Sequence, residues 1–176
     1  MKIIPGKLIL FATALLTLVV MELATNSQNA PAPNSAANPA PAGAEKAIRA
    51  RLDEVQSAAQ ALDADKVFSF VMENNAGAIA QNGRLSLTRS NALESTRRGF
   101  EALQAAGARI EYHFDQQQVS LLSPTIALVT GEGVTSVTAE DGMVSKTSFA
   151  QSVVLVLTNG DWKIFHAHRS FVAPVR

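Results

Sequence analysis

Polar side chains recur at every second position near the end of the chain, in the stretch DWKIFHAHRSFV at 161–172. His166, His168 and Ser170 form this series. Because side chains alternate between the two faces of a strand, these three should share a face with Trp162 and Ile164. A neutral imidazole can act as a general base or as a hydrogen-bond partner. This face is therefore expected to line a cavity, or to bury polar groups at an energetic cost.

The same alternation assigns the neighbouring residues to the opposite face of the strand. They are Lys163, Phe165, Ala167, Arg169 and Phe171. The two histidines also have a structural interpretation, in which the backbone or a serine satisfies them. A His-x-His pair could instead supply two metal ligands, with His113, Asp115 or Glu132 as the third. None of these three stands out by its spacing, so we expect no metal and no other cofactor.

Composition narrows the classes of partner. The chain has 176 residues, with 15 basic and 15 acidic side chains, so its formal net charge is zero. That balance gives no electrostatic reason to expect binding to nucleic acid or to an anionic membrane surface. The absence of cysteine excludes disulfides, thiolate nucleophiles, zinc sites built on cysteine and lipoprotein-type acylation. It also suits a protein that a bacterium exports.

Residues 1–24 are interpreted as a signal peptide. Lys2 and Lys7 precede an uncharged apolar run of 14 residues at 8–21, which falls short of the ~20 residues that span a bilayer as a helix. Glu22 makes cleavage near Ala24 unfavourable, so an uncleaved N-terminal anchor is the alternative. We therefore expect a periplasmic or secreted protein, or one that is anchored to the inner membrane through residues 1–24 alone.

A low-complexity segment and two helices follow. Residues 25–43 are rich in Pro, Ala and Asn and should form a disordered linker to a domain at 44–176. Apolar residues at three- and four-residue steps predict a first helix over 48–62. A second, shorter helix should start at Asp63 or Asp65. We interpret these carboxylates as helix caps rather than as a catalytic pair.

The rest of the domain is predicted to be mainly strands. An Asn-Gly pair at 82–83 indicates a hairpin within 74–88, and a third helix should run from Ser90 to a stop at Gly107. Alternating apolar residues and turn signals then predict strands at 109–122, 125–138, 143–158 and 161–172. The first of them is expected to contain a bulge. Long neighbouring strands joined by tight turns form an antiparallel meander.

This order of elements resembles the nuclear transport factor two-like (cone fold) superfamily, and within it the SnoaL-like and ketosteroid-isomerase-like bacterial domains. The resemblance covers residues 44–174. The segments on which the resemblance rests are ALDADKVFSF at 61–70, the Asn-Gly hairpin, TIALVTGEGV at 125–134 and NGDWKIFHAHRSF at 159–171. It implies an α+β fold in which a strongly curved, cone-shaped antiparallel sheet wraps around about three helices from the N-terminal half. A pocket is expected on the concave face.

The resemblance also implies that one face of the final strand looks into the cone. On that basis we expect the ligand-binding residues to be Trp162, His166, His168, Ser170, Tyr112, Phe68 and Gln151. Ser152, Phe70 and Met72 are alternatives at neighbouring positions. Such a pocket would be mostly apolar with a few polar groups, as small-molecule sites usually are.

Catalysis is less well supported than binding. Chemistry of the ketosteroid isomerase type needs a carboxylate base and an oxyanion hole built from a Tyr and a protonated Asp. This chain has one Tyr, and Glu132 is the only carboxylate within the central strands. If Glu132 points inward it is an acid or base, and if outward it is a surface charge or part of a dimer interface. The candidate catalytic residues are therefore His166, His168 and Glu132.

Three functions from different classes remain. The first is binding of a small apolar or amphipathic ligand outside the cytoplasm. The second is a small isomerase, lyase or hydrolase that uses a pocket His as general base. The third is an interaction module that forms a homodimer through its sheet. Fold alone does not give function. We rank binding or interaction above catalysis.

Overall fold

The computed structural model describes residues 42–73, 76–81 and 83–172, and the statements below concern these residues. The interpreted signal peptide and the linker up to position 41 lie outside them, as do Asn82 and residues 173–176. In the part that is described, no helix combines the length and the hydropathy that crossing a bilayer requires.

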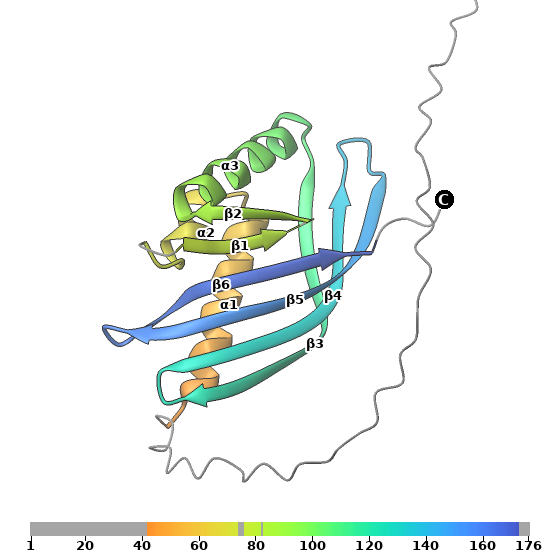
Figure 1. Cartoon of the computed structure of the whole chain (residues 1–176). Helices are drawn as coiled ribbons and strands as arrows, with labels where there is room; N and C mark the ends of the chain where they lie inside the picture. Colours follow the sequence, from red (N-terminus) through yellow and green to blue (C-terminus); the bar gives the residue numbers. More distant parts are fainter. Residues whose placement is uncertain (1–41, 74–75, 82, 173–176) are drawn as a thin grey trace, which may run out of the picture. The chain divides into compact units, whose positions relative to one another are not determined.

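The described residues form an α+β domain with a curved sheet (Figure 1). Its elements are α1 (Ala44–Gln60), α2 (Ala64–Ser69), β1 (Ala76–Gln81), β2 (Arg84–Thr88), α3 (Arg89–Ala105), β3 (Arg109–Ser123), β4 (Ile126–Thr138), β5 (Val144–Thr158) and β6 (Asp161–Phe171). The strand order is β2-β1-β6-β5-β4-β3. The predicted meander of β3 to β6 and the predicted hairpin of β1 and β2 are both confirmed.

One pairing joins the hairpin to the meander and has no signal in the sequence pattern. β1 runs parallel to β6, with Ile79 opposite Ala167 and Gln81 opposite Arg169. Closer to the start of β6, the segment after α2 pairs with the same edge. The Met72 amide donates to the backbone oxygen of Ile164 at 3.0 Å, and the Ile164 amide donates to the backbone oxygen of Phe70 at 2.8 Å. Two different segments therefore pair with this edge of β6 and provide hydrogen-bond partners for backbone N–H and C=O groups that would otherwise be unpaired.

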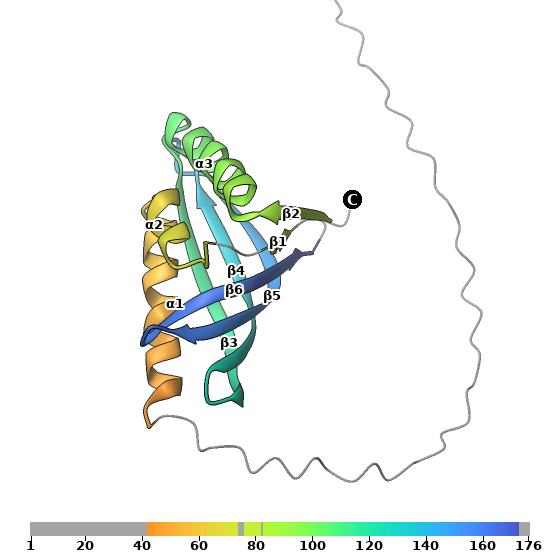
Figure 2. The same ribbon diagram turned by 60° about the vertical axis from the view of Figure 1, so that its left-hand side comes forward.

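Helix α1 lies along the inner face of the sheet, next to β3 and β6 (Figures 1 and 2). The predicted apolar stripe of this helix explains why. Its first half buries Ala44, Ile48 and Leu52 in the main hydrophobic core. The sheet contributes Ala127, Val129, Val153, Leu155, Trp162 and Ile164 to the same cluster. The second half of the stripe, including Val55 and Ala59, is only partly buried, and that difference leaves space beneath it.

The helix ends follow local hydrogen-bond chemistry. Asp63 caps α2 by accepting a hydrogen bond from the Lys66 amide at 2.8 Å, so its interpretation as a cap is confirmed. Ser90 was the wrong choice for the start of α3. The cap is Thr88, whose hydroxyl accepts from the Asn91 amide at 3.1 Å, because β2 runs directly into the helix. Gly107, with φ of +60°, ends α3 as predicted.

The bend of the sheet is located where β3 crosses β4. The predicted bulge in β3 falls between Phe114 and Gln116. Opposite it, a Cβ on Gly133 would lie 2.0 Å from the backbone oxygen of His113. A Cβ on Gly131 would lie 2.9 Å from the backbone oxygen of Gln116. Both glycines are therefore required by close backbone contact, and they allow the strands to curl over the helices.

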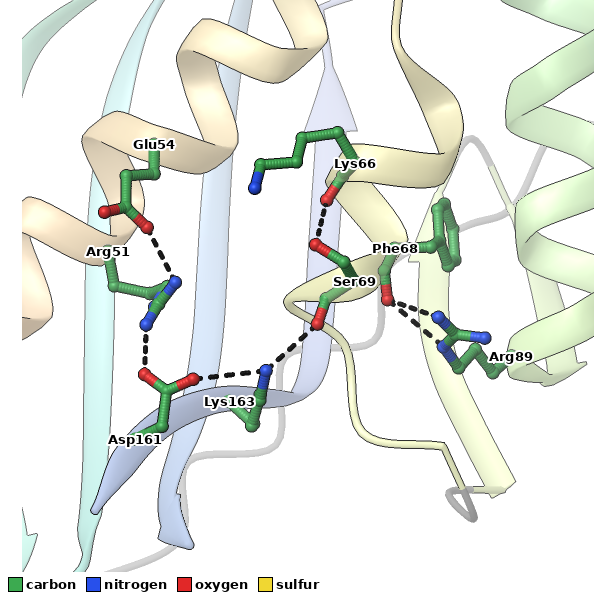
Figure 3. A network of polar contacts seen from close by, with 8 residues as sticks. All are labelled: Arg51, Glu54, Lys66, Phe68, Ser69, Arg89, Asp161 and Lys163. Atoms are coloured by element: carbon green, nitrogen blue, oxygen red, sulfur yellow. Dashed lines mark hydrogen bonds and ion pairs between the residues drawn. The ribbon is translucent and has the colours of Figure 1, made fainter. Parts of the chain in front are cut away.

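A network of polar contacts ties α1 and the end of α2 to the start of β6 (Figure 3). Arg51 of α1 forms ion pairs with Glu54, at 2.6 Å, and with Asp161. The second carboxylate oxygen of Asp161 lies 3.2 Å from Lys163 Nζ. Lys163 in turn donates to the backbone oxygen of Ser69 at 3.0 Å. Asp161 is thus the shared partner of two cations from different elements.

We expect Asp161→Asn to lower the free energy of unfolding by about 1 kcal/mol at pH 7. Partial burial acts to raise the pKa of Asp161, but the hydrogen bond from Lys163 and the charges of Arg51 and Lys163 outweigh it, so the pKa lies below its ordinary value. A lowered folded-state pKa means that this stabilisation is present above about pH 4 and is lost as the pH falls through the lowered pKa.

Denaturant unfolding of the wild type and the variant at pH 7 and near pH 3 checks this expectation. Asp53→Asn is the matched control, since Asp53 is exposed on α1 and forms no ion pair within the described part of the chain. An equal loss of stability at both pH values would contradict the role assigned to the Asp161 carboxylate.

Candidate functional site

A cavity of about 980 Å³ lies between the inner face of the sheet and the helices. Its apolar wall comes from all three helices and from two positions close to them. These residues include Leu52, Val55, Val67, Phe68, Val71, Ile79, Phe100 and Leu103. The cavity lies beneath the second half of α1, where Val55 and Ala59 are only partly buried and line it. Polar residues, among them Gln56, Thr96 and Gln117, line it as well. A concave space of this size, with apolar and polar groups in its wall, is suited to a small molecule.

The alternation predicted for the final strand is wrong beyond Ile164. Val154 of β5 pairs with His166, whereas the next residue, Leu155, pairs with Ile164. Phe165 is therefore an extra residue, which forms a one-residue β-bulge. Such an insertion exchanges the two faces of a strand beyond it. Trp162 and Ile164 point inward as predicted, but the inward positions that follow them are Ala167, Arg169 and Phe171.

His166, His168 and Ser170 therefore lie in register with the outward positions of β5. Their Cα partners are Val154, Ser152 and Ala150, respectively. His168 is exposed and borders the cavity at its rim, next to β1. His166 and Ser170 are not among the residues that line the cavity. The bulge thus separates the three residues that the period-two pattern had placed together in the cone.

The other predicted residues divide between the cavity and the rest of the domain. Phe68, Tyr112 and Gln151 line the cavity. Trp162 packs in the hydrophobic core with an exposed fraction of 5% and is not among the residues that line the cavity. Glu132 is exposed on the outer face, where its carboxylate accepts a hydrogen bond from Gln116 Nε2 at 2.7 Å. Of the two orientations considered for Glu132, the outward one is observed.

The alternatives at neighbouring positions do not reach the cavity. Ser152 pairs with His168 on the outer side of the sheet. Phe70 is buried beneath the guanidinium of Arg51, whose Cζ lies 4.8 Å from the ring centre. Met72 is absent from the cavity wall. In the described part of the chain, no three His, Cys, Asp or Glu side chains group in a way that could hold a metal ion.

Arg169 lines the cavity, although the predicted alternation had placed it on the opposite face of the final strand. Its Nε and Nη2 donate to Gln151 Oε1 at 3.2 and 2.6 Å. Its Cζ lies 5.0 Å from the ring centre of Tyr112 and 4.7 Å from that of Phe149. Burial lowers the pKa of Arg169 below its ordinary value, and Tyr112 offsets this only in part. A guanidinium remains charged under such conditions, so the cavity holds a fixed cation.

The signal that could have identified Arg169 is weak. Ala167, Arg169 and Phe171 alternate as regularly as the histidine series, and neither face is favoured by its composition alone. A bulge at a glycine would have been visible in the sequence, but this one occurs at Phe165. Only the pairing with β5 shows which series faces inward. Chemically, the site can offer hydrogen-bond donors, the positive charge of Arg169 and that of the exposed Arg84 beside apolar side chains.

Comparisons with known proteins agree with this fold. The family described as "SnoaL-like domain" matches residues 48–174. An NTF2-like protein with a cystatin-like fold from Novosphingobium aromaticivorans superimposes with a TM-score of 0.62 at 15% identity, over 74% of this chain and 83% of that one. A ketosteroid isomerase-like protein from Erwinia carotovora atroseptica does so with a TM-score of 0.57 at 16% identity, over 73% and 96% of the two chains.

A third solved structure is an NTF-2 like protein of unknown function from Shewanella oneidensis. Its TM-score is 0.57 at 15% identity, over 72% of this chain and 98% of that one. Identities at this level show a shared fold and do not carry substrates from one protein to another. A search of curated proteins found no match to this chain.

Proposed function

We propose, since this chain belongs to the SnoaL-like domain family, that its cavity binds a small, largely apolar or amphipathic molecule. The observation that carries the proposal is the open cavity of about 980 Å³ on the concave face of the sheet, whose wall combines apolar and polar side chains. A domain without a ligand would be more stable with this space filled, because unmade contacts in a core reduce stability. The sequence resemblance to this family is confirmed by the family match and by the solved structures.

An isomerase, lyase or hydrolase that uses a pocket His as general base is the alternative function. One structural neighbour is described as ketosteroid isomerase-like, and this description is the reason to consider an enzyme of this class. A general base must come within hydrogen-bond reach of the proton that it removes. The histidines that border the cavity are His113 and His168, and both are exposed. This placement favours binding over catalysis by a histidine.

We further propose that the domain acts outside the cytoplasm, in the periplasm or as a secreted protein. The support is the charge and hydropathy pattern of residues 1–24 and the absence of cysteine. Native mass spectrometry of protein purified from its own host tests the ligand and the processing together. We expect a mass that lacks the N-terminal segment, and a retained small molecule. A full-length mass would support the membrane-anchored alternative.

A variant that fills the cavity tests the binding proposal directly. Ala59 borders the cavity from the second half of α1, so Ala59→Phe places a ring in the space that a ligand would occupy. We expect binding of the neutral dye N-phenyl-1-naphthylamine to weaken at least tenfold, or by about 1.4 kcal/mol. Fluorescence titration of the full chain measures this. Ala50→Phe is the matched control, since Ala50 is exposed on the same helix.

Circular dichroism of both variants shows that the helix and the sheet are retained. Unchanged dye affinity in Ala59→Phe, or no dye binding by the wild type, would contradict the proposal of an internal binding site.

A second proposal is that two copies of the chain associate through the outer face of the sheet. Ile126 pairs with Val156 and Leu128 pairs with Val154, so these four side chains form one contiguous outer apolar patch. No helix within the described residues packs on this side, because α1 lies on the inner face. Exposed apolar patches of this kind are typical of interfaces between proteins.

We expect sedimentation velocity of the wild type at micromolar concentration to show a dimer. Leu128→Glu should shift the equilibrium toward the monomer by roughly a hundredfold, because a charge is costly to bury in an apolar interface. Thr130→Glu is the control, since Thr130 faces the same side of β4 two residues beyond the patch. A monomeric wild type, or equal effects of the two variants, would disprove this interface.

A further inference from the structure

Arg169 is a cation in the cavity wall without an anionic partner. Among the residues that the structure describes, no carboxylate lies within ion-pair distance of its guanidinium. Its side chain is partly buried, and its hydrogen-bond partners are neutral groups, the amide oxygen of Gln151 and the side chain of Tyr112. A partly buried charge that only neutral groups satisfy is costly to the folded protein. An arrangement with this cost is expected where a ligand completes it.

The guanidinium contacts a side-chain amide and two aromatic rings. Nε and Nη2, which form one edge, both donate to Gln151 Oε1. The aromatic rings of Tyr112 and Phe149 lie close to the guanidinium carbon. The side chain of Tyr112 also hydrogen-bonds the guanidinium. Arg169 is one of the residues that line the cavity, so its guanidinium borders the space that a ligand would occupy.

The remaining charged groups around the cavity do not neutralise this cation. Arg84 borders the cavity from β2, and Asp53 borders it from α1, and both are exposed. Exposed charges are screened by water and salt, so their effect on Arg169 is small. The helices contribute apolar side chains to the cavity wall, and β6 contributes the guanidinium of Arg169. The space thus combines a cation with apolar surface.

We infer that the ligand of this cavity is an amphipathic monocarboxylate, whose carboxylate binds Arg169 while its hydrocarbon body lies against α1, α2 and α3. The inference rests on the binding function proposed above and specifies its ligand class. The fork of a guanidinium matches the two oxygens of a carboxylate with two parallel hydrogen bonds. Burial lowers the pKa of Arg169, and the charge of a bound anion would offset the cost of that burial.

The charge balance decides between a carboxylate and a phosphate. One interior guanidinium compensates one negative charge, whereas a phosphate monoester carries up to about two at neutral pH. The second charge would stay unpaired in a cavity whose wall is partly apolar, where it is disfavoured. A cationic or neutral head group would leave Arg169 without an anionic partner. A single carboxylate is the head group that fits.

Displacement of N-phenyl-1-naphthylamine from the full chain by decanoate, 1-decanol and decylamine tests the inference. An apolar pocket without a cation prefers decanol, since an ionised carboxylate is costly to desolvate. We expect the opposite order in the wild type, with decanoate binding roughly ten- to a hundredfold more tightly than decanol and decylamine binding worst. Arg169→Gln should abolish the preference for decanoate over decanol, measured as the ratio of their two affinities.

Two controls separate the role of the guanidinium from general charge. Arg98→Gln removes an exposed arginine of α3 that pairs with Glu94, and it should keep the preference for decanoate. Arg169→Lys keeps the charge but loses the fork, and its preference should be intermediate. The comparison of ligands in the wild type decides the matter even if a variant at Arg169 does not fold.

The outcomes distinguish this inference from the binding function on which it rests. If decanol binds the wild type as tightly as decanoate does, the carboxylate is excluded and an apolar binding site remains. If the dye binds and neither ligand displaces it, the ligand class is also wrong. If the dye does not bind at all, the binding function fails and the inference fails with it.

Discussion

The close approach of β3 and β4 at Gly133 is the constraint on which the rest of the domain depends. A side chain there would meet the backbone of His113, so the two strands can cross at this distance only at a glycine. The bend lets long strands close around one helix instead of lying flat against several. Trp162 and the first half of α1 pack in the hydrophobic core, while the space beneath the second half of α1 stays open. The cavity is therefore a result of curvature, not of missing side chains in an otherwise regular core.

Most of the fold could be predicted because its signals are local. The stripe of α1, the cap at Asp63, the stop at Gly107 and the glycine-containing turns each act within a few residues. The parallel pairing of β1 with β6 brings together segments that are about 90 residues apart, and no local pattern encodes it. The cap of α3 was misplaced by two residues because both Thr88 and Ser90 have the required hydroxyl. The site was predicted less well, because it depends on strand register.

The cavity combines two features that each reduce stability. Apolar side chains such as Val55 and Leu103 are left only partly packed, and the guanidinium of Arg169 is held in a largely apolar space. Gln151 and the rings of Tyr112 and Phe149 reduce the second cost, since they provide a hydrogen-bond acceptor and two aromatic faces. Departures from good packing and charge pairing in an otherwise consistent domain are typical of functional sites.

The bulge at Phe165 has a consequence for how this cavity could change during evolution. The strand after it carries two complete sets of side chains, with an arginine on one side and two histidines on the other. If the extra residue lay beyond Phe171 instead, the same sequence would turn His166, His168 and Ser170 inward and expel Arg169. A shift in the position of one residue would thus replace a permanent cation with two imidazoles and a hydroxyl, which can each donate or accept hydrogen bonds. The same strand sequence can therefore give two different cavity chemistries, depending on its register with β5.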